Sequence, residues 1–171
     1  MVHKLLWVII LSKQYNRQKC VEYAKKWALS RNPKYYDYEK IGGDCTNFAS
    51  QCIYAGCGVM NYNNWYYRNA NNKSPSWTGV EFLYNFLINN HSQGPSGTEV
   101  NQTKLQLGDL IQLSSTGTRF SHSLIVVGIK NINYLSDIYI ATHSMDAYFR
   151  PVSTYEFQKI RFIHINDIVK N

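Results

Sequence analysis

The chain has 171 residues, of which 44% are hydrophobic and 17% charged, so it has the length of one domain and a composition that excludes a disordered chain. Eighteen Lys and Arg residues against eleven Asp and Glu give a net charge of +7, which suits polyanionic partners such as nucleic acid, anionic lipid or a bacterial wall polymer. No Lys- or Arg-rich run is present, so no specific nucleic-acid partner is expected.

The amino terminus combines a basic start with the apolar run 5–11, as a short signal peptide does. No small-residue cleavage site follows, and the run is shorter than the ~20 apolar residues that a membrane span requires, so no stable span is expected. Residues 1–14 are therefore an apolar leader or an edge of the domain, and the sequence leaves both readings open. Residues 15–171 are predicted to form a single domain.

Helical patterns occupy the first half of the chain. Apolar residues recur at three- and four-residue spacing from residue 15, which predicts a helix that ends before Pro33. A second helix is predicted over residues 44–56 and a third over residues 78–89. Between them, residues 57–77 are rich in Asn, Tyr and Trp and are expected to form a long irregular loop.

The second half of the chain changes character. Residues 90–98 are rich in Ser and Gly and predict a turn or loop. Apolar runs at 110–113, 123–129, 138–142 and 161–165 then predict strands. Helices followed by strands predict an α+β fold with an antiparallel sheet.

The sharpest local motif is Gly-Gly-Asp-Cys-Thr-Asn at residues 42–47. Asp44 stands at the predicted N-cap, where its carboxylate can accept a hydrogen bond from the Asn47 backbone N–H. Cys45 would then lie in the first helical turn, where the helix dipole and unpaired N–H groups favour a nucleophilic thiolate. The same N–H groups could receive the oxyanion that attack on a carbonyl creates. The alternative is that Cys45 is a small, buried and inert residue.

A cysteine nucleophile needs a general base, and the base needs an orienting group. His122 begins the most hydrophobic strand, and His143 follows the next strand along the chain. If these strands pair antiparallel, the two rings come near opposite positions on one face, with His122 as base and His143 fixing its tautomer. Asp146 is the main alternative orienting residue. The competing interpretation is that His122 and His143 are unrelated surface histidines.

Four cysteines stand at positions 20, 45, 52 and 57, and they form no CxxC pair. Neither these cysteines nor the scattered histidines have the short spacing that a zinc site needs, so neither a metal nor another cofactor is expected. The even count leaves one or two disulfides open.

The motif Gly-Asp-Cys-Thr-Asn-Phe-Ala-Ser-Gln-Cys at residues 43–52 resembles the signature of the bacterial putative amidase domain family. Flanking motifs are similar to that family in the same order, over roughly residues 15–165. They are Tyr15-Asn16-Arg17, Tyr23-Ala24, Arg31-Asn32-Pro33, Trp65-Tyr66-Tyr67, Ser76-Trp77-Thr78, Leu107-Gly108-Asp109-Leu110-Ile111, Ser121-His122-Ser123 and Thr142-His143-Ser144.

This family is in turn similar to the NlpC/P60 and CHAP cell-wall hydrolases, which are papain-like cysteine peptidases and amidases. The resemblance implies a papain-like (NlpC/P60-type) fold, with N-terminal helices packed on a C-terminal antiparallel sheet and a Cys45–His122–His143 site. Cys57 stands where the family pattern has glycine, and its presence near a reactive Cys45 raises the chance of oxidative pairing.

The resemblance also suggests that a tyrosine upstream of the cysteine donates to the oxyanion beside the Cys45 backbone N–H. Tyr38 is preferred over Tyr36 and Tyr35 for this role. Aromatic residues of the middle segment are expected either to wall the substrate groove or to fill the core. They are Trp65, Tyr66, Tyr67 and Trp77.

These observations predict a cysteine amidase or peptidase that hydrolyses an amide bond in peptidoglycan through a thioester. An acyl transferase (transpeptidase-like) on the same site and a catalytically silent wall-binding module are the alternatives. The expected partner is peptidoglycan or a peptide substrate, and a monomer is expected. The expected location is the cell wall or outside the cell, with the cytoplasm as the alternative.

Overall fold

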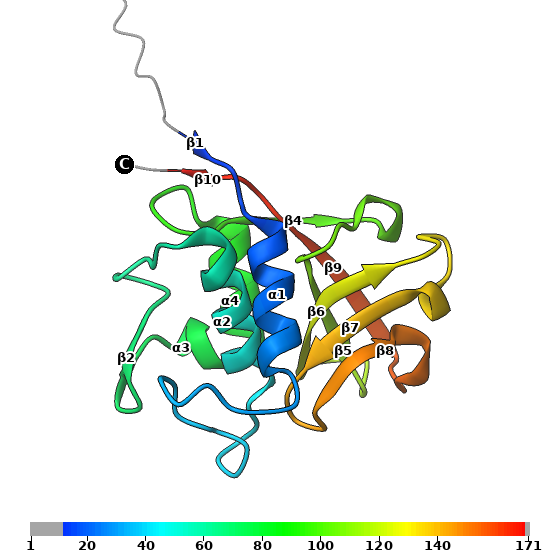
Figure 1. Ribbon diagram of the computed structural model, residues 1–171, viewed down its shortest axis with the longest axis horizontal. Helices are drawn as coiled ribbons and strands as arrows, with labels where there is room; N and C mark the ends of the chain where they lie inside the picture. The colour runs from blue at the N-terminus through cyan, green and yellow to red at the C-terminus, as the bar shows by residue number, and fades with distance from the viewer. Residues whose placement is uncertain (1–11, 170–171) are drawn as a thin grey trace, which may run out of the picture.

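A computed structural model describes residues 12–169, in which helices pack against one face of a sheet (Figure 1). The helices are α1 (Arg17–Trp27), α2 (Cys45–Cys57), α3 (Pro75–Thr78) and α4 (Val80–Asn89). None of the helices in this part of the chain is long and apolar enough to cross a bilayer. The predicted leader falls mainly on residues 1–11, which lie outside the described residues.

The main sheet has six strands in the spatial order β4-β9-β5-β6-β7-β8, and each neighbouring pair is antiparallel. The strands are β4 (Gly97–Val100), β5 (Leu110–Ser114), β6 (His122–Ile129), β7 (Ile138–Thr142), β8 (Ala147–Pro151) and β9 (Lys159–Ile165). The predicted α+β class and antiparallel sheet are therefore confirmed. The papain-like assignment is finer than this architecture and stays a prediction.

Two predicted helices have different limits in the structure. Helix α1 begins after Asn16, whose side chain accepts the Lys19 backbone N–H, and it ends at Trp27 rather than next to Pro33. The third predicted helix is two helices, α3 and α4, separated by the extended residue Gly79.

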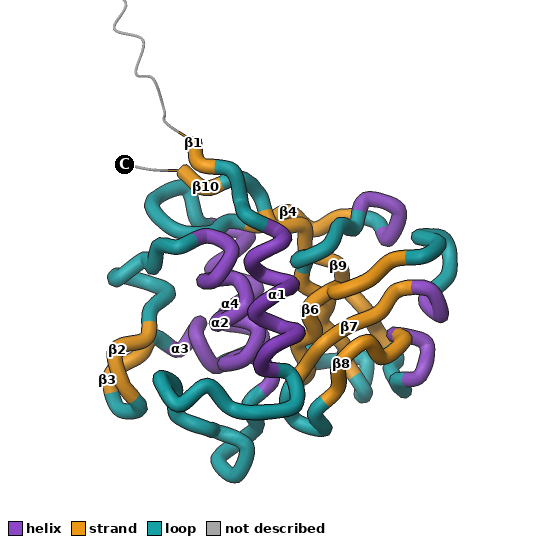
Figure 2. The backbone as a smooth tube through the Cα atoms, viewed as in Figure 1, coloured by secondary structure: helices purple, strands orange, loops and turns teal. Residues whose placement is uncertain are grey.

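Short elements connect these parts (Figure 2). The predicted irregular loop contains a small hairpin of β2 (Tyr67–Asn69) and β3 (Asn72–Lys73). Near the two ends of the described chain, β1 (Ser12–Lys13) pairs with β10 (Ile168–Val169). Three 3-10 turns complete the structure: η1 (Gln102–Lys104), η2 (Leu135–Asp137) and η3 (Val152–Thr154).

The sheet separates two hydrophobic cores. In β6, Ile125 and Val127 belong to the core shared with the helices, whereas Leu124 and Val126 belong to the core on the opposite face. Side chains of a strand alternate between faces, so each residue of β6 is assigned to one side of the sheet. This alternation decides which groups can reach the start of α2.

Candidate active site

Cys45 is the first residue of α2, and 7% of its surface is exposed. Asp44 occupies the N-cap position, but its carboxylate makes no capping hydrogen bond to the first turn. Instead, Asp44 Oδ1 accepts the Tyr38 backbone N–H at 2.9 Å and the Asn47 side-chain amide at 2.8 Å. The predicted bond from the Asn47 backbone N–H is therefore wrong, because the loop before the helix takes the carboxylate. Cys45 thus lies at a helix start whose dipole is not compensated by a capping side chain.

Asp44 connects the helix start to the rest of the domain. Its Oδ2 lies 2.6 Å from His143 Nδ1 and 3.7 Å from Arg31 Nε. Its backbone N–H donates to Ser144 Oγ at 2.7 Å. The side chain is 1% exposed. The residue before Cys45 is therefore fixed by groups that follow α1 and β7.

His143 is a buried residue that holds Asp44 and does not orient His122. Its Nε2 lies 2.9 Å from the Trp27 carbonyl oxygen at the end of α1, and because a carbonyl only accepts, this nitrogen donates. Its ring stacks on Phe48 with centroids 4.1 Å apart. Its Nδ1 contacts Asp44 Oδ2, so both ring nitrogens have hydrogen-bond partners within the fold. The predicted His143–His122 contact is therefore wrong.

His122 lies on the opposite face of the sheet from α2. Ser123 faces the helices, because its Oγ is 2.9 Å from Thr46 Oγ1, so the preceding side chain faces the second core. There the His122 ring lies 5.7 Å from the Tyr155 ring. The β6–β7 register pairs Ile125 with Ala141, and its continuation sets Ser123, not His122, opposite His143. A difference of one residue in register moves a side chain to the other face, which is why the predicted pair does not form.

The surroundings of the Cys45 thiol oppose its ionisation. Burial raises its pKa above the usual value, and the Asp44 charge acts in the same direction. Hydrogen bonds from the Ser123 backbone N–H and from the Thr46 hydroxyl and backbone N–H lower the pKa, but burial is the larger effect. The helix start by itself favours a thiolate, and burial shifts the pKa in the opposite direction.

His122 is a neutral imidazole with a free nitrogen. Burial, and secondly the Arg150 charge, lower its pKa to about 4. Its Nε2 is buried and has no hydrogen-bond partner among residues 12–169. A neutral ring of this kind can accept a proton at its free nitrogen, whereas both His143 nitrogens already have hydrogen-bond partners.

The depressed His122 pKa predicts a pH-dependent stability. Between its folded value of about 4 and the usual 6.5, the unfolded chain binds more protons, so stability falls as pH decreases through this window. We expect the wild type to lose about 1–2 kcal/mol more than His122→Gln between pH 7 and pH 5. Urea denaturation at both pH values measures this difference. Parallel losses in the two proteins would contradict the assignment.

Two other predicted site residues point to different partners. The Tyr38 hydroxyl donates to the Ala70 carbonyl at 3.1 Å, so in this structure it does not face Cys45 as an oxyanion donor. Asp146 forms a two-bond ion pair with Arg31, at 2.7 and 3.1 Å, and does not orient His122. The Asp146 assignment rested on closeness to His143 in sequence, and the Tyr38 assignment on the family resemblance; the loops after β7 and before α2 direct both side chains elsewhere.

The predicted groove aromatics are mainly core residues. Trp65 and Trp77 are both 0% exposed, and their indole N–H groups donate to Ser50 Oγ and Asn47 Oδ1 on α2. Tyr66 and Tyr67 are half-buried and pack against the same core. The core-filling interpretation is therefore correct for the two tryptophans.

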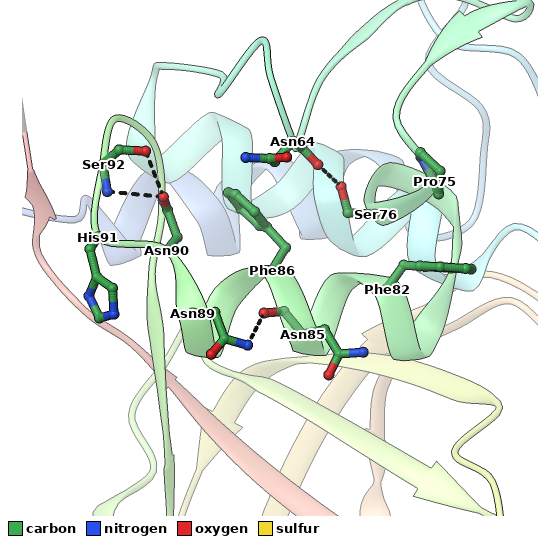
Figure 3. A pocket seen from close by; sticks show the side chains of 10 residues that line it. All are labelled: Asn64, Pro75, Ser76, Phe82, Asn85, Phe86, Asn89, Asn90, His91 and Ser92. Atoms are coloured by element: carbon green, nitrogen blue, oxygen red, sulfur yellow. Dashed lines mark hydrogen bonds between the residues drawn. The ribbon is translucent and has the colours of Figure 1, made fainter.

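A cavity of about 640 Å³ lies beside α3 and α4 (Figure 3). Its lining includes neither Cys45 nor either of the two candidate histidines. The lining residues are Asn64, Pro75, Ser76, Phe82, Asn85, Phe86, Asn89, Asn90, His91 and Ser92. This cavity is therefore separate from the site at the start of α2.

The four cysteines are unpaired and buried. Cys45 and Cys57 are the first and last residues of α2, so twelve residues at about 1.5 Å each set them about 18 Å apart. Oxidative pairing between them is therefore excluded in this fold. Residues 12–169 contain no group of three His, Cys, Asp or Glu side chains that could hold a metal ion.

Sequence reasoning missed the contacts made by Ser123, Thr46 and Arg31. Ser123 belongs to the Ser-His-Ser motif, in which the histidine is the residue that suggests catalysis, and Thr46 follows Cys45 directly. The alternation of a strand was the available signal, because it assigns His122 and Ser123 to opposite faces once either is placed. Nothing local indicated that Arg31 would reach Asp44.

Comparison with known proteins gives a family. A family model described as a putative amidase domain matches residues 14–166. The uncharacterized protein YhbB of Bacillus subtilis (strain 168) is 33% identical over 119 residues, which are 67% of this chain and 37% of that protein. No solved structure matches the chain significantly. Since the matched range includes α2 and the whole main sheet, the chain belongs to the putative amidase domain family, whose description indicates an amidase-like hydrolase.

Proposed function

We propose that this chain is a cysteine-dependent amidase that hydrolyses amide bonds in bacterial peptidoglycan. The observation that carries the proposal is the position of Cys45 at the uncapped start of a buried helix, where backbone N–H groups of Ser123 and Thr46 hydrogen-bond its sulfur. Such donors stabilise negative charge that develops on sulfur and on a carbonyl oxygen beside it. Membership of an amidase family supports the same reaction class.

The base in this proposal is His122. It directly precedes Ser123, whose backbone N–H reaches the Cys45 sulfur, and its Nε2 has no competing partner in the described structure. Because the ring lies on the second-core face beside Tyr155, this role requires the backbone at the start of β6 to rearrange when substrate binds. His122 is the first residue of β6, so the change involves the end of the strand and not its centre.

The reaction proceeds through a thioester. His122 takes the Cys45 proton as the sulfur attacks the carbonyl carbon, and the Cys45 backbone N–H receives the oxyanion. The tetrahedral intermediate then collapses, the C–N bond breaks, and the leaving amine takes the proton from His122. Water, deprotonated by His122, attacks the thioester and releases the acid, and the sulfur regains its proton. His143 acts as a positioning residue that holds Asp44 and the helix start.

The substrate class rests on charge and on resemblance. The chain carries a net charge of +7, which favours polymers that bear carboxylates and phosphates. The motifs around Cys45, His122 and His143 resemble those of cell-wall hydrolases. Such a substrate requires the chain to act at the cell wall.

Digestion of purified peptidoglycan tests the proposal. We expect the protein to release fragments with one new amine and one new carboxyl group, and mass spectrometry of these fragments names the bond that is cut. Sedimentation with the polymer without any released fragment would instead indicate a wall-binding module. Amide products formed preferentially from an added amine would indicate acyl transfer.

A further inference from the structure

A continuous row of side-chain hydrogen bonds crosses the neighbouring strands β9, β5 and β6 and leads to Cys45. The Arg161 guanidinium donates to Gln112 Oε1, with Nε at 2.8 Å. Gln112 Nε2 donates to Ser123 Oγ at 3.2 Å, and Ser123 Oγ lies 2.9 Å from Thr46 Oγ1. Thr46 Oγ1 in turn lies 3.8 Å from Cys45 Sγ. Three strands and one helix contribute to this row.

The direction of the Gln112 amide is fixed by its surroundings. Its Oε1 faces the Arg161 guanidinium, which only donates, and its Nε2 also donates to the Val80 carbonyl at 3.0 Å, which only accepts. A flipped amide would set donor against donor and acceptor against acceptor. Gln112 therefore donates to Ser123 rather than accepting from it.

The charge on sulfur sets the direction of the two hydroxyl groups, because each hydroxyl can donate or accept whereas a thiolate only accepts. When the sulfur carries negative charge, the Thr46 proton is directed to it. Thr46 Oγ1 then accepts from Ser123 Oγ, which already accepts from Gln112. Each member thus donates to the next, and the row ends at sulfur.

Burial and aromatic packing hold the row in place. Gln112 and Ser123 are 0% exposed and Thr46 is 1% exposed. The Arg161 guanidinium lies between the rings of Tyr84 and Phe120, 3.6 and 3.9 Å from their centroids. Water therefore does not compete for these bonds, and a cation at one end polarises each successive donor.

We propose that Arg161, Gln112, Ser123 and Thr46 form a hydrogen-bond relay that directs positive polarity to the Cys45 sulfur and stabilises its negative charge during attack. This inference rests on the proposed role of Cys45 as nucleophile. Arg161, Gln112 and Ser123 are positioning residues, because they act on the sulfur only through Thr46, which contacts it directly.

Several other charged or titratable groups lie close to the row or to Cys45. Asp44 precedes Cys45 and opposes its negative charge, and it is itself paired with His143 and Arg31. His122 lies at the start of β6, and Glu81 pairs with Arg161 at 3.0 Å. None of these groups changes in the variants below, so differences between variants report on the hydroxyl groups.

The rate of Cys45 alkylation by iodoacetamide between pH 7 and pH 10.5, followed by peptide mass spectrometry, tests the relay. Only the thiolate reacts, so the pH profile gives the thiol pKa without need of a substrate. At pH 8 we expect Thr46→Val to react about 10-fold more slowly than wild type. Ser123→Ala should react about 3-fold more slowly, although its hydroxyl does not touch sulfur.

Matched variants separate a relay from a general loss of structure. Thr142→Val removes another buried hydroxyl that bonds the Ser123 carbonyl but lies outside the row, so its rate should be unchanged. Thr46→Ser keeps the hydroxyl and should react at nearly the wild-type rate. The double variant Thr46→Val/Ser123→Ala should be no slower than Thr46→Val, since the row is already broken.

Two results would overturn the relay. If Ser123→Ala is alkylated at the wild-type rate, only Thr46 affects the sulfur and no relay exists. If Thr142→Val is slowed as much as Ser123→Ala, the loss reflects packing in general and not the row. If Thr46→Val does not fold, Ser123→Ala and Thr46→Ser still decide the question. Failure of the wild type to cut peptidoglycan, with the alkylation pattern as expected, would remove the proposed function and leave the relay established.

Discussion

Replacement of Cys45 by alanine is expected to reduce amide hydrolysis by about 10⁴-fold or more, because no other group can form the covalent intermediate. The fold should persist, since the change removes one sulfur from a helix start held by Asp44, Thr46 and Asn47. Initial rates of fragment release from peptidoglycan give the loss, and circular dichroism confirms that the helices remain.

Cys52→Ala is the matched control for this loss. Cys52 lies in the same helix and is 0% exposed, but it is far from the helix start. We expect this variant to lose some stability through a small cavity, and to keep a rate within about threefold of wild type when folded. Undiminished hydrolysis by Cys45→Ala would end the proposal of a cysteine mechanism.

Asp44→Asn is expected to lower the free energy of unfolding by about 3–5 kcal/mol. The substitution keeps the side-chain shape but removes the buried carboxylate that contacts His143 Nδ1 and the Arg31 guanidinium. It also replaces an acceptor that the Tyr38 backbone N–H and the Asn47 amide both use. Urea denaturation at pH 7 measures the change, and the urea m-value shows whether the transition stays two-state.

Asp146→Asn gives the comparison, because Asp146 also pairs with Arg31 but lies near the surface, with 33% of its side chain exposed. Exposed ion pairs contribute little, so we expect a loss below about 1 kcal/mol. Similar losses in the two variants would mean that Asp44 does not have the buried anchoring role that its contacts indicate.

Much of the fold could be predicted from local patterns. The helix α2 and the strand β6 were predictable because their apolar residues follow a helical spacing in α2 and form a long apolar run in β6. The strands β4 and β8 were missed, because each has a single buried residue and shows no alternation. Gly79 divides a helical pattern that periodicity alone reads as continuous.

The candidate site was predictable only where its parts are neighbours in sequence. Cys45 stands at a helix start because the preceding Gly-Gly-Asp interrupts regular structure, and that arrangement is local. The pairing of His122 with His143 depended on strand register, which contacts elsewhere in the sheet set. The direction of the Cys45 pKa shift was likewise not predictable from local sequence, because burial by other elements raises the pKa and is the largest effect.

The sequence by itself determined the α+β class, the antiparallel sheet, the helix start at Cys45 and the amidase family, because periodicity and short motifs carry that information. Only the tertiary structure decided that His143 holds Asp44, that His122 faces the second core and that Arg161 connects to Cys45 through Gln112 and Ser123. The reason is physical. Contacts between segments far apart in the chain depend on register and burial, and a shift of one residue reverses the face on which a side chain lies.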